Sequence, residues 1–214
     1  MPRPILVVLL TLAWSSAALG AASDIERVNG SIEVEAGREA GDVSTVNGSL
    51  DIGAGARVRD VSTVNGAIRV ESGAAVRSLD TVNGRLELGE RVQVADDVAT
   101  VNGSIVIGKG ARVSGSVGNV NGRISLQGAS VAGGLETTSG DIEVGAGSVV
   151  GGGIRVEKSG GWWSSPGSSS RNPRVTIGPG AVVNGTLHFE REVDLVVDPA
   201  ARIGPVAGVQ PRQP

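Results

Sequence analysis

The sequence predicts an all-β protein, a single-stranded parallel β-helix in the form of a triangular β-solenoid with 18–19 residues per coil. Two observations predict this fold. A Val-Asn-Gly phrase returns every 18 or 19 residues, with its asparagines at Asn29, Asn47, Asn65, Asn83, Asn102 and Asn121. Within this period an aliphatic residue recurs every six positions, as at Val34, Ala40, Val46 and Ile52. Three such segments per coil predict a triangle with one inward anchor on each side.

Asn-Gly between strands also favours β-hairpins, but the phase of the apolar residues argues against them here. In a two-residue hairpin Val46 would share a face with Ser49 and Asp51, while Leu50 and Ile52 would point the other way. At a solenoid corner the chain changes direction, so Val46, Leu50 and Ile52 are all expected to point inward. Coils stacked ~4.8 Å apart then pair as parallel strands.

The composition suits a thin, stacked interior. The chain has 34 glycines for its corners, one Phe and no Tyr, so its core must be filled by aliphatic side chains. The stacked asparagines either form a side-chain amide ladder or serve only the backbone conformation of the corner.

Residues 1–20 are typical of a secretory signal peptide. They begin with a basic Arg3, continue with an apolar run from Ile5 to Trp14 that is too short to span a bilayer, and end in small residues at Ala18 and Gly20. We therefore expect an exported protein, periplasmic or at the cell surface, without a transmembrane segment. The absence of cysteine excludes disulfides and thiolate metal sites.

The predicted solenoid covers residues 21–203, and its first coil begins at Ile25 and Val28. No amphipathic helix precedes this coil to cover it, and uncovered strand edges favour pairing with another chain. We therefore predict self-association through Ile25 and Val28. Residues 204–214 form a Pro-rich tail that is expected to blunt the other end, because proline removes ladder donors.

Two outward columns are predicted. The strand after the corner carries Glu33, Asp51, Arg69, Glu87, Val106, Ser125 and Glu143, with ion pairs expected along Asp51–Arg69–Glu87 on a solvated face. Threonines recur just before the corner, at Thr45, Thr63, Thr81, Thr100 and Thr137. One threonine per coil is not the two-column array expected of an ice-binding surface.

Residues 158–174 interrupt the repeat with a Gly/Ser/Pro-rich loop that must be expelled from the coil. This loop carries Trp162 and Trp163, the two tryptophans that remain once the signal peptide is removed. Either one of them packs back on the solenoid, or the pair provides an aromatic contact for a glycan, a membrane interface or a partner protein. Trp162 and Trp163 are therefore the candidate ligand-binding residues.

No catalytic constellation is visible, and no cofactor or metal is expected. The repeat resumes at Ile177, and the single His188 on the following strand has no second histidine to assist it. Asp96 and Asp97 are adjacent, so they do not form the facing carboxylate pair that glycoside hydrolysis needs. A net charge of −3 with interspersed Lys and Arg disfavours nucleic-acid binding.

The stretch from Val175 to Leu187, VTIGPGAVVNGTL, resembles the repeats of bactofilins, the polymer-forming bacterial β-solenoid proteins. The Val-Asn-Gly-x-Ile-x-Val phrases also resemble the β-strand repeats of exported bacterial adhesin-like proteins. The bactofilin resemblance implies a right-handed solenoid that polymerises through its ends without nucleotide. The signal peptide and the Trp loop depart from bactofilins, which points to the envelope instead of the cytoskeleton, and no catalytic residue carries over.

The sequence thus predicts a non-enzymatic, exported structural or adhesion-type scaffold of the bacterial cell envelope that self-assembles through its N-terminal coil. The alternative is a binding module that holds an envelope polysaccharide, peptidoglycan or an envelope protein at Trp162 and Trp163.

Overall fold

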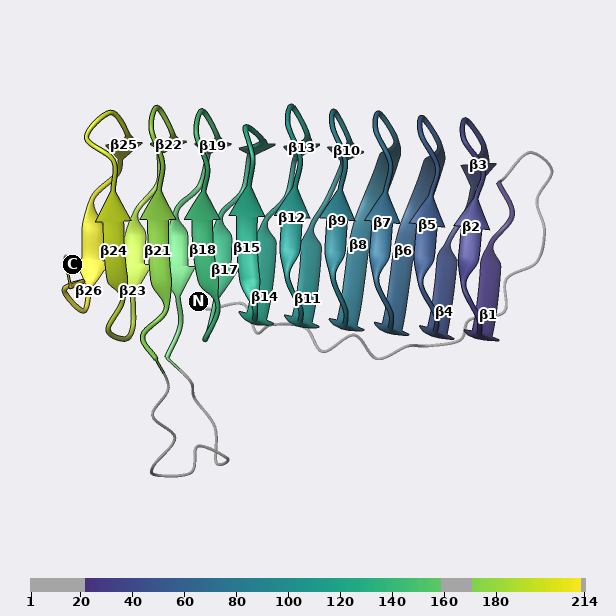
Figure 1. Ribbon diagram of the computed structural model, residues 1–214, viewed down its shortest axis with the longest axis horizontal. Coiled ribbons are helices and arrows are strands. Elements are labelled where there is room, and N and C mark those ends of the chain that lie inside the picture. The colour runs from purple at the N-terminus through teal and green to yellow at the C-terminus, as the bar shows by residue number, and fades with distance from the viewer. Residues whose placement is uncertain (1–21, 159–170, 213–214) are drawn as a thin grey trace, which may run out of the picture.

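The computed structural model describes residues 22–158 and 171–212 of the chain. Within these ranges the protein is all β, and its short strands are stacked as successive coils in a single row (Figure 1). The predicted signal peptide, Trp162 and Trp163 lie outside the described residues. The predicted β-solenoid is confirmed.

Each coil contributes up to three strands, which stack into three walls. The first wall is a nine-stranded sheet made of β2 (Ile32–Val34), β5 (Leu50–Ile52), β7 (Ile68–Val70), β9 (Leu86–Leu88), β12 (Ile105–Ile107), β15 (Arg123–Leu126), β18 (Asp141–Val144), β21 (Arg174–Ile177) and β24 (Asp194–Val197). The second wall contains β3 (Glu39–Ala40), β10 (Gln93–Val94), β13 (Arg112–Val113), β16 (Ser130–Val131), β19 (Val149–Val150), β22 (Val182–Val183) and β25 (Arg202–Ile203).

The third wall contains β1 (Ile25–Asn29), β4 (Val43–Asn47), β11 (Val98–Asn102), β14 (Val117–Asn121), β17 (Leu135–Thr137), β20 (Ile154–Val156), β23 (Leu187–Phe189) and β26 (Val206–Gly208). Two longer strands, β6 (Arg57–Asn65) and β8 (Ala75–Asn83), run through the corner between the second and third walls. They join these walls into one 17-stranded sheet. Strand β26 carries the solenoid into the predicted C-terminal tail.

All strand pairings are parallel and join equivalent positions of neighbouring coils, such as Ile32 with Leu50 and Leu50 with Ile68. Inward positions form one continuous aliphatic core, as the composition predicts. Leu50 and Ile52 are fully buried, as predicted, and Phe189 is the one aromatic side chain in the described core. Because each coil covers the next, no coil has a complete core of its own.

The expected inward position of Val46 is wrong. Along β4, strict alternation from the buried Val43 places Thr45 inside and leaves Val46 half-buried. The same holds in later coils, where Thr63, Thr81, Thr100 and Thr137 are buried. The predicted beat of aliphatic anchors therefore holds on the first wall and, apart from the exposed Ala132, whose place Val131 takes, on the second wall. On the third wall a threonine takes the expected place of the valine before the corner in most coils, while Val156 and Phe189 follow the beat and are buried.

Burial of these hydroxyls is compensated by hydrogen bonds to the preceding coil. The Thr63 hydroxyl donates to the Gly48 carbonyl over 3.1 Å, and Thr45 donates to Gly30 over 3.3 Å. Asn119 takes the threonine position in one coil and donates its Nδ2 to Gly103, but its buried Oδ1 accepts no hydrogen bond within the described ranges.

The asparagine ladder forms. Each Asn Nδ2 donates to the Oδ1 of the asparagine in the preceding coil over 3.0–3.1 Å, through Asn29, Asn47, Asn65, Asn83, Asn102 and Asn121. The next coil carries Ser139 at this corner, so the ladder ends at Asn121. The column is therefore structural, because its side-chain groups are occupied by one another.

The corner between the first and second walls needs a left-handed residue. Glycine supplies it in most coils, as Gly55 does with a φ of 68°, while Arg91 holds the equivalent position with a φ of 55°. Arg91 is the one non-glycine residue with positive φ in the described chain.

The predicted interruption falls between β20 and β21. Asp141 and Arg174 occupy equivalent positions on β18 and β21 although they are 33 residues apart, against 18 for Asn29 and Asn47. Pairing of the first wall continues across the insertion in an unbroken register. The solenoid therefore accommodates the additional residues at one corner without losing a coil.

Candidate functional site

The first coil has a neighbour on one side only among the described residues. Strands β1, β2 and β3 pair with β4, β5 and β6, respectively, and with no other described strand. Ile25, one of the two predicted association residues, is half-buried and packs against the core. Val28, the other, is 68% exposed, the highest value among the exposed large apolar residues.

The asparagine ladder also ends at this coil. Asn29 accepts from Asn47 through its Oδ1, and its own Nδ2 has no partner in the part of the chain that the structure describes. An amide donor, exposed strand backbone and an exposed valine thus share one end of the molecule.

The C-terminal end is more fully covered. The backbone N–H of Leu195 on β24 donates to the carbonyl of Arg212, and the N–H of Arg212 donates to Val193. Arg212 also forms a 2.8 Å ion pair with Glu192. Arg212, the last described residue, therefore pairs with the outer edge of the first wall, and Pro205, next to β26, offers no N–H.

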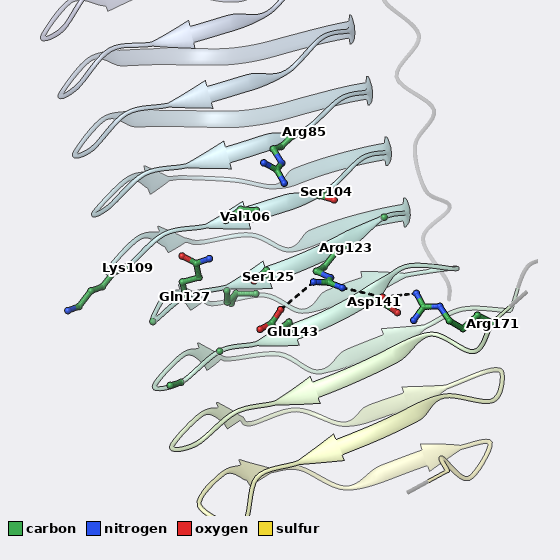
Figure 2. A pocket seen from close by; sticks show the side chains of 15 residues that line it. Arg85, Ser104, Val106, Lys109, Arg123, Ser125, Gln127, Asp141, Glu143 and Arg171 are labelled. Carbon is green, nitrogen blue, oxygen red and sulfur yellow. Dashed lines mark hydrogen bonds and ion pairs between the residues drawn. The ribbon is translucent and has the colours of Figure 1, made fainter. Parts of the chain in front are cut away.

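A shallow groove of about 930 Å³ lies on the outer face of the first wall, across β9, β12, β15 and β18 (Figure 2). Its floor is made of the small residues Ser104, Val106 and Ser125. At the position of Val106 and Ser125, the neighbouring coils carry the charged Glu87 and Glu143. Its rim carries four cations and two carboxylates: Arg85, Lys109, Arg123 and Arg171, with Asp141 and Glu143.

Asp141 is the most engaged carboxylate of the groove. It accepts hydrogen bonds from Arg171 over 2.8 Å and from the backbone N–H of Arg174 over 3.0 Å. Burial alone would raise the pKa of Asp141, but these two hydrogen bonds and the charges of Arg171 and Arg123 outweigh it and lower that pKa. Asp141 therefore remains ionised and fixes Arg171.

Arg123 is more loosely held. It lies 3.8 Å from Asp141 and 4.0 Å from Glu143, and its guanidinium makes no hydrogen bond within the described ranges. Arg85 and Lys109 form no ion pair with any described residue. The groove therefore offers cationic groups whose hydrogen-bonding capacity is free.

Arg85, Lys109 and Arg123 were not predicted as site residues from the sequence. The signal that points to them is a break in the outward column, where Val106 and Ser125 interrupt a series that is otherwise charged from Glu33 to Glu143. The predicted pairs earlier in this column are present, with Arg69 lying 3.9 Å from Asp51 and 3.8 Å from Glu87.

The predicted ligand-binding residues Trp162 and Trp163 lie outside the described residues. The ends of their segment are described. Lys158 donates its backbone N–H to Glu190 over 3.3 Å, and Arg171 lies at the rim of the groove. The segment that carries the tryptophans thus rejoins the solenoid beside the groove.

His188 lies half-buried on β23 in a second, smaller hollow of about 400 Å³, with Glu136 and Arg155 nearby. Its Nε2 is 3.9 Å from Glu190. Among the described residues, no group of three or more His, Cys, Asp or Glu is arranged to hold a metal ion. No described helix has the length and hydrophobicity to cross a membrane.

Comparison of the chain with protein-family models, with curated proteins and with solved structures found no match.

Proposed function

We propose that this protein is a non-enzymatic, exported scaffold of the bacterial cell envelope that assembles through its first coil. The observation that carries the proposal is the difference between the two ends. The first coil leaves β1, β2 and β3 without a second described partner, whereas at the C-terminal edge Arg212 covers β24, and only β25 and β26 keep a single described partner. A second copy of this chain is the partner that best matches an edge built from the same repeat.

The smooth walls also support a structural role. Among the described residues the uniform coils form shallow grooves, whereas small-molecule catalysis usually needs an enclosed pocket. Export and the envelope location rest on the predicted signal peptide at residues 1–20 and on the resemblance to exported repeat proteins.

Light scattering and negative-stain imaging of residues 21–214 over a wide concentration range test the proposal. We expect end-to-end dimers or filaments that grow with concentration. Val28→Lys should raise the concentration needed for assembly by at least about tenfold, because a buried, unpaired charge opposes the contact.

Val149→Lys is the matched control. Val149 is 38% exposed and lies on β19, between β16 and β22 and away from the first coil, so lysine there should leave assembly unchanged. Ile25→Lys also tests the edge, but Ile25 packs against the core, so its effect on stability must be measured in parallel. A protein that stays monomeric at every concentration would contradict the proposal.

The second candidate function is an envelope glycan- or protein-binding module that uses Trp162 and Trp163. It is favoured by the position of Arg171, which connects the end of the tryptophan segment with the cationic groove. Replacing both tryptophans with alanine should abolish capture of the ligand, and retained capture would contradict this function.

A further inference from the structure

We propose that the groove across β9, β12, β15 and β18 binds an extended, carboxylated polysaccharide through Arg85, Lys109 and Arg123. This inference is independent of assembly through the first coil. It gives the second candidate function a ligand class and a site, and it does not require either tryptophan.

The excess of cations over carboxylates at the rim favours an anionic ligand. Of the two carboxylates at the rim, Asp141 is held by Arg171 over 2.8 Å and Glu143 lies at 4.0 Å from Arg123. That leaves Arg85 and Lys109 without a counter-charge among the described residues. A guanidinium prefers carboxylate or phosphate oxygens, to which it donates two parallel hydrogen bonds.

The spacing of the cations favours an extended polymeric ligand. Leu86, Ile105 and Ile124 are aligned partners on β9, β12 and β15, and Arg85, Ser104 and Arg123 directly precede them. Arg85 and Arg123 are therefore two coils apart, roughly 10 Å along the solenoid axis. A polymer lying along the axis presents acidic groups at intervals and can therefore contact both arginines at once.

The floor of the groove suits a carbohydrate (Figure 2). Ser104 and Ser125 offer hydroxyl groups that donate and accept hydrogen bonds, and Val106 provides a small apolar surface between them. Among the described residues, no aromatic side chain on which a nucleic-acid base would stack lines the groove, and the net charge of the chain is −3. These features favour an acidic glycan over a nucleic acid.

Calorimetric titration of residues 21–214 with polygalacturonate at low ionic strength tests the proposal. We expect saturable binding that weakens as salt is added. Arg85→Glu combined with Lys109→Glu should weaken binding by at least about tenfold, because two attractive charges become repulsive. Val106→Glu should weaken it as well, since it places a carboxylate in the floor.

The matched control is Arg112→Glu combined with Arg202→Glu. Both arginines are exposed on the second wall and form no ion pair with described residues. Their replacement changes the net charge of the protein by the same amount as the groove variant does. This variant should bind within about twofold of the parent protein. Methyl-esterified polygalacturonate, which keeps the sugar chain and loses the charge, should not bind.

Four results would overturn the inference. The first is an absence of binding to polygalacturonate, and the second is an equal loss of affinity in the groove and control variants. The third is undiminished binding of the esterified polymer. The fourth is tighter binding of single-stranded DNA that the groove variants also abolish, which would assign the site to nucleic acid.

Discussion

Glycine at the Val-Asn-Gly corner provides space, since the close approach of neighbouring coils leaves no room for a side chain. A Cβ added to Gly66 would overlap the carbonyl oxygen of Gly48 in the preceding coil. Gly66 does not have a positive φ, so its backbone conformation alone does not require glycine. In the first coil, a Cβ added to Gly30 would meet no described atom within 4 Å, because no described coil is stacked in front of it.

Gly66→Ala should therefore lower the free energy of unfolding by about 1–3 kcal/mol, because the new methyl group forces two backbones apart. Gly118→Ala is the control, since a Cβ there would meet its nearest atom, the Glu136 carbonyl oxygen, at 3.9 Å. It should change stability by less than about 1 kcal/mol. Denaturant unfolding of both variants measures the difference, and equal effects would contradict the steric explanation.

At the scale of the strand, the sequence predicts which segments are extended better than it predicts which side chains point inward near a corner. Leu50 and Ile52 follow the aliphatic beat and are buried, as predicted. Val46 follows the same beat but lies beyond Thr45, and alternation along β4 turns it outward. Hydrophobicity alone favours valine at the inward position. Thr45 is tolerated there because its hydroxyl donates a hydrogen bond to Gly30 in the preceding coil. Gly30 is 15 positions away, so the local sequence does not reveal this contact.

The corner between the second and third walls gathers acidic side chains from successive coils. Asp60 is paired with Arg77 and accepts a 2.7 Å hydrogen bond from Ser78. Burial would raise its pKa, but these contacts outweigh burial and lower it. Asp80, one coil further on, has no such partner, and burial together with the charges of Asp60, Asp97 and Asp96 raises its pKa to about 6.

Asp80 should make the protein less stable as the pH rises through 6. Its pKa is higher in the folded than in the unfolded chain, so its contribution to stability is fully present below about pH 4, near the ordinary pKa of an aspartate, and is lost as the pH rises to about 6. Asp80→Asn should raise the free energy of unfolding at pH 7.5 by about 1–2 kcal/mol, after allowance for solvent screening, with little effect at pH 4.

Urea unfolding of the parent and Asp80→Asn proteins between pH 4 and 8 measures this difference. Glu157, whose pKa is also raised by burial and by Glu136 and Glu190, changes both proteins alike. A stability difference that is independent of pH would contradict the role assigned to Asp80.

For the whole molecule, the coils of the N-terminal half are interchangeable in their contacts. Arg59 pairs with Asp42 and Arg77 with Asp60, each across 17 residues, so the same ion pair recurs one coil later. Parallel register at fixed offsets means that removal of one complete coil brings equivalent residues together.

Deletion of residues 48–65 should therefore preserve the fold. It joins Asn47 to Gly66 and so keeps the Asn-Gly corner, and it places Arg77 beside Asp42. We expect a cooperative transition with a free energy of unfolding lower by roughly 1–3 kcal/mol, the share of 18 residues in an ordinary domain. Thermal unfolding followed by circular dichroism measures it.

Deletion of residues 48–56 is the control. Half a coil brings corners against strands and apolar positions to the outer face, so this protein should lose its cooperative transition. Equal tolerance of both deletions would mean that the register does not determine stability.

The candidate groove was the part of the molecule least accessible from the sequence. Arg85, Ser104 and Arg123 are aligned although the coils here are one residue longer than the earlier ones, and this alignment depends on the strand register. The groove itself forms because its floor residues are smaller than the side chains around them, which the sequence does not show directly. The first coil was easier to predict, because an uncovered edge follows directly from where the repeat begins. Its part in assembly stays a prediction.

The insertion between β20 and β21 adds residues to the chain without changing the strand pairing of the solenoid. Pairing of the first wall continues from one side of that corner to the other, as between Ile142 and Val175, in the same register as in coils without an insertion. We therefore expect the solenoid to fold and to carry an epitope or a small domain that is grafted between Lys158 and Arg171.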